Sequence, residues 1–194
     1  MRPFRIFTLM GTIEITGTPD LDAVISVANL KSHLRVDHSD EDSLIEAYRD
    51  AAIAWVEDYC NTRLGDVTAV WHLPGFVTTQ APVAPVSAIS SVTYEDQGGT
   101  TQTLDTSYYW FDIKRKPMRI TFENFPQVYE DSFLPVHVNL TLGYAEASIP
   151  KPLVHAVRLM VAQLYEMRQP VQASQTYEVP LGIHSIVAPY RVIT

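Results

Sequence analysis

The strongest constraint on the fold lies in residues 26–63, whose second half carries apolar residues at the 3.6-residue spacing of an amphipathic helix. These residues are Leu44, Ile45, Tyr48, Ala51, Ala52, Trp55, Val56 and Tyr59. An acidic run at 40–42 precedes them, where carboxylates oppose the positive end of the helix dipole. We expect Ser39 or Asp40 to cap the first turn, because each can accept hydrogen bonds from free backbone N–H groups. The sequence thus predicts one long helix ending before Gly65.

Two further helices are predicted to pack with the long one. A short helix over about 27–34, capped by Ser26, would form a hairpin with it, and a hairpin cannot bury its own apolar stripe. The partner begins after Pro150, ends before Pro170 and carries a stripe of Leu153, Val157, Met160, Val161 and Leu164. We therefore predict a bundle formed by residues 26–65 and 150–169.

The segment between the helices has the alternation of β-strands rather than a helical period. Residues 136–142 are the clearest case, with Val136, Val138, Leu140 and Leu142 on one face. Gly98-Gly99 marks a hairpin turn, and five or six antiparallel strands would form a sheet or a small barrel-like sandwich. The predicted fold class is α+β: a small helical bundle with an antiparallel β domain, residues 66–149, inserted. An N-terminal arm, 1–25, and a C-terminal tail, 170–194, would lie outside the core.

Composition narrows the possible functions. The chain has 194 residues and a net charge of −8, which argues against a dedicated nucleic-acid binder. Its single cysteine, Cys60, excludes an internal disulfide framework and a cysteine zinc site, and is interpreted as core packing. No signal peptide and no apolar run of about 18 residues are apparent, so no membrane partner is expected.

No catalytic pattern emerges from the sequence. There is no G-x-S-x-G motif, no glycine-rich phosphate loop and no pair of histidines at metal-binding helical spacing. His33 and His38 lie near Asp37 and the acidic run, where a cation site is conceivable, but helix capping explains those carboxylates better. We predict no catalytic residue, no metal and no cofactor, and hence no enzyme. A hydrolase using His38 with the neighbouring carboxylates is a remote alternative.

One basic cluster and one aromatic run are candidates for subunit or DNA contact. The basic cluster is Lys114-Arg115-Lys116 with Arg119. It is either a solvated hairpin tip or a contact with phosphate or with an acidic neighbouring subunit. About two side chains in the run 108–111 should be exposed, since successive strand residues face opposite sides. The candidate contact residues are Lys114, Arg115, Lys116, Arg119, Tyr109 and Trp110.

The helical hairpin also carries a resemblance to a known family. Residues 30–42 read LKSHLRVDHSDED and are followed by Trp55-Val56-Glu57 and a closing aromatic, Tyr59. Near the other end stand Leu181-Gly182-Ile183 and the segment 188–192, APYRV. With this order of elements the chain resembles the head–tail connector (adaptor) proteins of long-tailed bacteriophages.

That resemblance implies a structural protein of virion assembly. Such a protein forms a ring, a dodecamer in this family, below the portal, where it extends the DNA channel and offers a platform for tail attachment. The implied partners are further copies of the chain, the portal protein, a tail-completion or stopper protein, and DNA that passes without sequence-specific binding. The implied location is the head–tail interface of the virion, after assembly in the host cytoplasm. The portal contacts carried over by resemblance are Leu181, Gly182, Ile183, Pro189, Tyr190, Arg191 and Val192.

A rival interpretation needs no assembly. In it the chain is a monomeric or dimeric ligand-binding α+β domain, with a pocket between the sheet and the bundle. The mass of the protein in solution, and reconstitution with a portal protein, distinguish the two interpretations.

Overall fold

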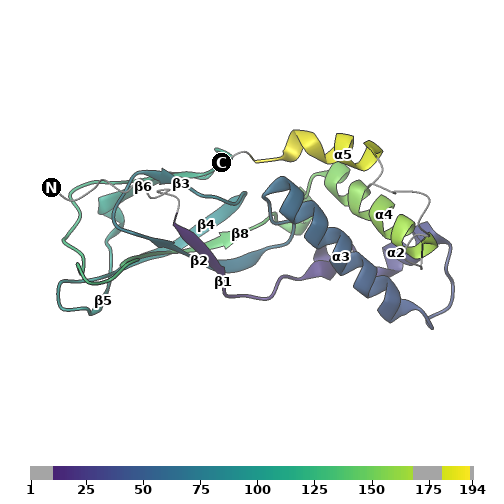
Figure 1. The fold of residues 1–194 in the computed structure, drawn as a ribbon, viewed down its shortest axis with the longest axis horizontal. Helices are drawn as coiled ribbons and strands as arrows, with labels where there is room; N and C mark the ends of the chain where they lie inside the picture. The colour runs from purple at the N-terminus through teal and green to yellow at the C-terminus, as the bar shows by residue number, and fades with distance from the viewer. Residues whose placement is uncertain (1–10, 168–180, 193–194) are drawn as a thin grey trace, which may run out of the picture. The chain divides into compact units, whose positions relative to one another are not determined.

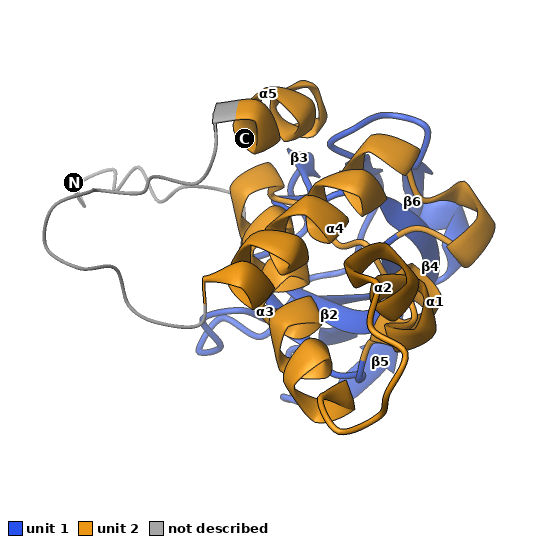
Figure 2. Cartoon of the chain, turned by 90° about the vertical axis from the view of Figure 1, so that its right-hand side faces the viewer, with its two compact units in different colours: residues 1–18, 66–143, 194 blue, residues 19–65, 144–193 orange. Residues whose placement is uncertain are grey.

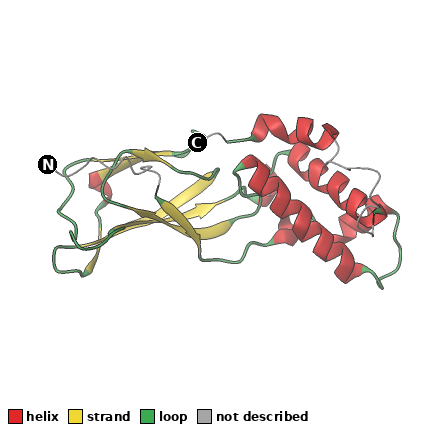
Figure 3. Ribbon diagram, in the orientation of Figure 1, coloured by secondary structure: helices red, strands yellow, loops and turns green. Residues whose placement is uncertain are grey.

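A computed structural model describes residues 11–167 and 181–192 of the chain (Figure 1). Contacts divide these residues into two compact units, coloured separately in Figure 2. The β unit comprises 11–18 and 66–143, and the helical unit comprises 19–65, 144–167 and 181–192. Figure 3 shows the helices in red and the strands in yellow. The predicted α+β class is confirmed, with the antiparallel strands inserted between two helices that pack together.

The helical unit contains five α-helices and two short 3₁₀ turns among the described residues. In chain order they are α1 (Leu21–Val24), α2 (Val27–Leu34), α3 (Asp42–Cys60), η2 (Glu146–Ser148), α4 (Lys151–Glu166), α5 (Leu181–Val187) and η3 (Ala188–Tyr190). Helices α3 and α4 pack together, and Trp55 and Leu164 lie half-buried against one common core. The front hairpin therefore finds its partner across the β insertion. The stripe itself differs in detail, since Ala51 is exposed while Ile53 and Cys60 are buried.

The start of α3 differs from the expectation. Its N-cap residue is Glu41, with no side-chain cap, so neither Ser39 nor Asp40 has the predicted role. The backbone N–H of Asp42 bonds to the carbonyl oxygen of Ser39 at 3.2 Å, and the Glu41 carboxylate accepts a hydrogen bond from the hydroxyl of Tyr165 on α4. The Glu41 carboxylate thus makes a tertiary contact and does not cap the first turn. The cap of α2 is confirmed, because Ser26 Oγ accepts from the N–H of Asn29 at 3.3 Å.

A buried arginine joins α1 to α3. Arg49 is 7% exposed, and its guanidinium pairs with the carboxylates of Asp22 and Asp50. Asp20 caps α1 by accepting from two backbone N–H groups of the first turn. Breaking such a pair would leave a charge buried without compensation. Residues 20–25 are consequently part of the helical core.

The β unit is built from two antiparallel sheets. The larger has the order β1-β2-β8-β4-β5, and the smaller has the order β3-β7-β6. The strands are β1 (Thr12–Ile15), β2 (Val67–Leu73), β3 (Thr79–Gln80), β4 (Val86–Glu95), β5 (Thr101–Thr103), β6 (Tyr109–Asp112), β7 (Arg119–Phe122) and β8 (Val136–Leu142). A 3₁₀ turn, η1 (Thr106–Tyr108), precedes β6. Seven of these strands, β2 to β8, lie in the segment for which only five or six were predicted, because short strands give little alternation to detect.

The two sheets share one apolar core. Trp71 of β2, Val92 of β4, Met118, Ile120 of β7 and Val138 of β8 are all essentially inaccessible to solvent. Strand β8 alternates as predicted, with its valines and leucines buried and the residues between them half-buried. The unit is therefore a small sandwich.

The expectation of a free arm and a free tail differs from the structure. Strand β1 pairs with β2 in the register Thr12↔His72 to Ile15↔Ala69, so it covers an edge of the sheet that would otherwise be open. Val24 and Ile25 are buried in the helical core, and so are Ile183 and Val187. Apolar side chains at both ends of the chain gain more from burial than from remaining in solvent. The parts of those expectations that concern residues 1–10, 168–180 and 193–194 lie outside the described residues.

Candidate interaction surfaces

The C-terminal hook, defined here as residues 181–192, is bonded to the end of α3. The backbone N–H of Val192 donates to the carbonyl oxygen of Cys60 at 2.8 Å, and Asn61 Nδ2 donates to the carbonyl oxygen of Val192 at 3.0 Å. The Cys60 thiol donates a weaker bond to the carbonyl of Val187 at 3.6 Å, and burial raises the pKa of that thiol. The hook is thereby bonded to the end of α3 at two places, at Val187 where α5 ends and at Val192 after η3.

Aromatic contacts add to this attachment. The His184 ring lies edge-on to Trp55 and to Tyr59, with centroids 5.2 Å and 5.0 Å away. Trp55 and Tyr59 stack on each other at 5.4 Å, and the Arg191 guanidinium lies 5.5 Å from the centre of the Tyr59 ring. Such cation–π contacts favour a cation held over an aromatic face. The aromatic positions predicted as core thus also serve as the seat of the hook.

The predicted portal-contact residues divide by exposure. Ile183 and Val192 are buried, so they hold the hook in place rather than offer a surface. Gly182, Pro189 and Arg191 are exposed, and Tyr190 is half-buried. Leu181 begins α5, but its side chain lies outside the described residues. The part of the hook available to a partner is therefore centred on residues 189–191.

The hairpin of β6 and β7 brings the basic cluster to an exposed turn. Lys114, Arg115, Lys116 and Arg119 are all exposed. The Asp112 carboxylate accepts from the backbone N–H of Lys114 at 3.0 Å and so shapes the turn. The hairpin presents its positive charge at one end of the smaller sheet.

The aromatic run of the same hairpin is only partly available. Trp110 and Phe111 are 52% and 43% exposed on β6, which is an edge strand. Tyr109 is 7% exposed and its ring packs against Phe111 and Phe122. Tyr109 therefore belongs to the core, and Trp110 is the predicted aromatic contact residue that a partner can reach.

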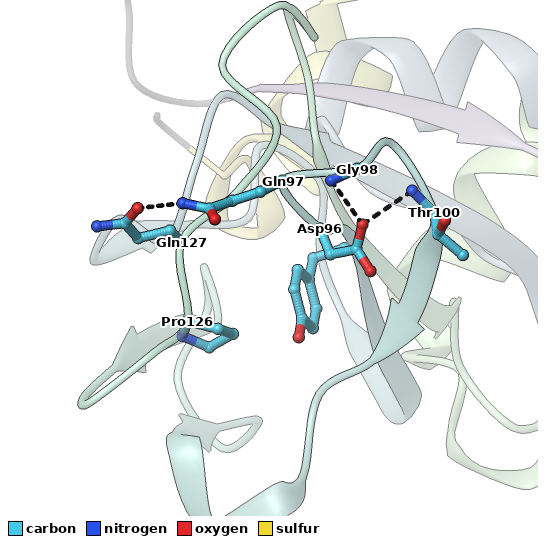
Figure 4. A pocket seen from close by; sticks show the side chains of 7 residues that line it. Asp96, Gln97, Gly98, Thr100, Pro126 and Gln127 are labelled. Atoms are coloured by element: carbon cyan, nitrogen blue, oxygen red, sulfur yellow. Dashed lines mark hydrogen bonds between the residues drawn. The ribbon is translucent and has the colours of Figure 1, made fainter.

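A polar hollow lies beside the turn that joins β4 to β5 (Figure 4). The Asp96 carboxylate accepts hydrogen bonds from the N–H groups of Gly98 and Thr100, at 2.9 Å and 3.0 Å, and from the Gln102 amide at 2.9 Å. These bonds, led by the one from Gln102, lower the pKa of Asp96. The side chain of Gln97 meets that of Gln127 across the hollow.

Two adjoining hollows extend this surface. One includes Asp105, whose pKa is lowered chiefly by the hydrogen bond from the Ser107 backbone N–H, and the other includes Glu130 and Asp131. We call the combined surface the acidic groove. The residues that line it include Asp96, Asp105, Glu130, Asp131, Tyr94 and Tyr108. The sequence pattern does not reveal the groove, because its carboxylates come from separate loops.

The acidic run before α3 is mostly engaged within the chain. Asp42 pairs with Lys31 Nζ at 2.6 Å, and Glu41 accepts from Tyr165 as described above. Only Asp40 of the three stays exposed. Within residues 11–167 and 181–192, no group of three or more His, Cys, Asp or Glu side chains is placed to hold a metal ion.

Two histidines form an unpredicted row on the outer face of the larger sheet. His72 Nδ1 and His137 Nδ1 are 2.8 Å apart, so one ring donates and the other accepts. His72 Nε2 lies 3.1 Å from Glu14, and His137 Nε2 lies 3.8 Å from Glu95. Burial, and then the neighbouring His72, lower the pKa of His137 against the opposing effect of Glu95. The row depends on strand register, which the sequence pattern does not reveal.

These features define a class of protein that acts through its surfaces. Both units have an apolar core, and the β6–β7 hairpin exposes Trp110, Phe111 and Ile113. Among the helices that the structure describes, none is long and apolar enough to cross a bilayer.

The front half of the chain matches a known family. Residues 24–107 match the model of the phage gp6-like head-tail connector proteins. The match includes the hairpin on which the resemblance rests and stops before the hook. The expectation of a connector is confirmed, and a connector of this family is a structural component rather than an enzyme. No curated protein sequence matches the chain.

Solved structures share the whole fold. A chain in the neck of an empty GTA particle computed with C6 symmetry is 22% identical, with a TM-score of 0.76 over 94% of this chain and 96% of that one. A chain of the virion of a native gene transfer agent (GTA) particle is 21% identical, with a TM-score of 0.77 over the same shares. A chain in the neck of a native GTA particle computed with C12 symmetry is 21% identical, with a TM-score of 0.74 and the same coverage. The similarity thus covers most of both chains.

Proposed function

We propose that this connector forms a closed ring at the neck of a phage-like particle, directly below the portal protein. The observation that carries the proposal is the agreement of fold with neck chains over 94% of the sequence. Those relatives stand in necks computed with C6 and C12 symmetry, which supports a dodecamer here. The ring would extend the DNA channel and receive a tail-completion or stopper protein. Copies would accumulate in the host cytoplasm before assembly.

The hook is the proposed portal contact. Its buried residues, Ile183 and Val192, fix it to α3, and its exposed residues, Pro189 and Arg191, face solvent. A surface held rigidly before binding loses less entropy on association than a free tail does. The rigid attachment therefore supports a docking role for the turn at 189–191.

DNA is proposed to pass through the ring without sequence-specific binding. The net charge of −8, repeated around a ring, would repel phosphates wherever it lines the channel. Of the acidic run only Asp40, with nearby Asp37, is exposed, because the other two carboxylates are engaged within the chain. Neutralising Asp37 and Asp40 to asparagine and assaying DNA ejection tests whether they contribute. Unchanged ejection would remove them from the channel lining.

The docking role is tested by co-purification with the portal protein. We expect Arg191→Glu to weaken capture by the portal, because it reverses the charge at the exposed turn. Lys151→Glu is the matched control, since it reverses an equally exposed charge at the start of α4. Circular dichroism verifies that both variants are folded. Equal capture of the two variants would exclude Arg191 from the contact.

A further inference from the structure

We propose that neighbouring copies in the ring bind head to tail through the β unit, the basic β6–β7 hairpin of one copy docking into the acidic groove of the next. This interface rests on the proposed ring and specifies which surfaces close it. Two surfaces of opposite charge on one chain are what a heterologous contact requires. Four observations support the pairing.

Charge is segregated along the chain. Residues 112–119 contain four basic residues and one aspartate, a net charge of +3. Because the whole chain carries −8, everything outside this segment carries −11. The hairpin is thus a positive surface on a strongly acidic protein, and a second copy supplies the complementary charge.

The hairpin has unpaired cations beside exposed apolar side chains. In the part of the chain that the structure describes, no carboxylate lies within ion-pair distance of Lys114 or Arg115. Trp110, Phe111 and Ile113 are 52%, 43% and 37% exposed on or next to β6. Exposed aromatic residues flanked by charges are typical of protein interfaces.

The groove is suited to receive such a hairpin. Hydrogen bonds lower the pKa of Asp96 and of Asp105, so both remain negative at any physiological pH. Glu130 and Asp131 add exposed carboxylates, and Tyr94 and Tyr108 line the same surface. The groove therefore offers charge for the basic residues and rings for Trp110.

The two surfaces lie at opposite ends of one strand. Tyr108 lines the groove immediately before β6, and the basic turn follows Asp112 at the far end. Four extended residues separate the two by roughly 13 Å. The hairpin of a copy thus points away from its own groove, so the contact has to form between copies and can propagate around a ring.

DNA is the competing occupant of the hairpin. Its phosphates would meet the same lysines and arginines. The net charge of −11 on the rest of the chain would, however, oppose the approach of DNA. The exposed Trp110 and Phe111 give no preference for a double helix. A second copy is favoured because one partner satisfies both the charge and the apolar surface.

Charge reversal tests the pairing. The hairpin variant is Lys114→Glu with Arg115→Glu, and the groove variant is Glu130→Lys with Asp131→Lys. All four side chains are exposed and none makes a hydrogen bond that shapes a turn. The control variant is Arg35→Glu with Lys151→Glu. It changes the net charge of the chain by as much as the hairpin variant does, but in the helical unit. Self-association is measured by sedimentation velocity up to roughly millimolar protein, and circular dichroism verifies folding.

We expect the wild-type and control proteins to associate as concentration rises, and each charge-reversed variant to associate at least about tenfold more weakly. An equal mixture of the two variants should recover association, since each negative hairpin then meets a positive groove and each positive hairpin a negative one. A monomeric wild type, a variant that associates as the wild type does, or a mixture no better than its components would overturn the proposal.

Two readouts keep this inference separate from its premise. If both variants still form neck rings with the portal, the interface is wrong while the ring stands. If the wild type associates as predicted but never joins a portal, the proposed function fails and the interface stands. Loss of DNA binding by the hairpin variant, with its self-association intact, would assign the hairpin to DNA and overturn the pairing.

Discussion

The imidazole of His184 lies edge-on to the indole of Trp55, with ring centroids 5.2 Å apart. This contact carries the last described helix onto the longest one, across more than a hundred residues of sequence. Residues 181–192 are therefore a fixed part of the helical unit. A partner that binds the hook meets a surface already in place.

Burial of the hook should be measurable as stability. Ile183 is 2% exposed in the helical core, so Ile183→Ala removes buried methyl groups and leaves a cavity. We expect the free energy of unfolding to fall by about 2–5 kcal/mol. Gly182→Ala is the control, because an added Cβ there has no heavy atom within 4 Å. Urea unfolding should show the control unchanged or more stable by up to about 1 kcal/mol. Equal stability of the two variants would mean that the hook is not packed.

Docking of β1 depends on a glycine. Gly11 has φ +66°, and a Cβ added there would lie 2.1 Å from the carbonyl oxygen of His72. Gly11→Ala should therefore displace the start of β1 and cost about 1–3 kcal/mol. Gly75→Ala has open space around it and should cost less. Hydrogen exchange of the β1 and β2 amides reports the difference. Slow exchange retained in Gly11→Ala would contradict the pairing.

Glu57 should make stability depend on pH. It accepts the Leu64 N–H at 2.7 Å and pairs with Arg63 at 3.0 Å, but burial outweighs both and raises its pKa. A carboxyl group with a raised pKa binds its proton more tightly when folded, so ionisation lowers stability. Wild type should lose stability relative to Glu57→Gln as pH rises from about 4.3, the ordinary pKa of glutamate. Urea unfolding at several pH values measures this, and a difference independent of pH would contradict it.

The pair of His72 and His137 should make stability fall as pH decreases, which is opposite to the effect of Glu57. Burial and the neighbouring His72 lower the pKa of His137, so the folded state holds that proton less tightly than the unfolded state does. Stability should then fall as pH drops below about 6.5, the ordinary pKa of histidine. His137→Gln should reduce this loss. NMR titration of the ring gives the direct test, and protonation of His137 above the ordinary histidine value would refute the assignment.

The sequence predicts best where a long period or strict alternation exists. The stripe of α3 and the alternation of β8 predicted both elements and the inserted arrangement. The predicted cap of α3 is wrong, because the N-cap residue is Glu41 and its carboxylate binds Tyr165, a residue 124 positions away. A local pattern carries no information about such a contact.

The interaction surfaces depended on tertiary structure. The basic cluster was visible as a run of letters, but the burial of Tyr109 and the exposure of Trp110 follow from their places on an edge strand. The acidic groove unites carboxylates from separate loops, and the pair His72 and His137 depends on register. Short helices such as α5 have too few residues to show a period, so the packing of the hook could not be predicted.

We propose above all that this connector assembles below a portal as a ring. Native mass spectrometry of the portal protein mixed with this chain tests it most directly, because it counts the copies bound. The account predicts a single complex in which twelve copies join each portal ring. A portal whose mass is unchanged at excess connector would contradict it.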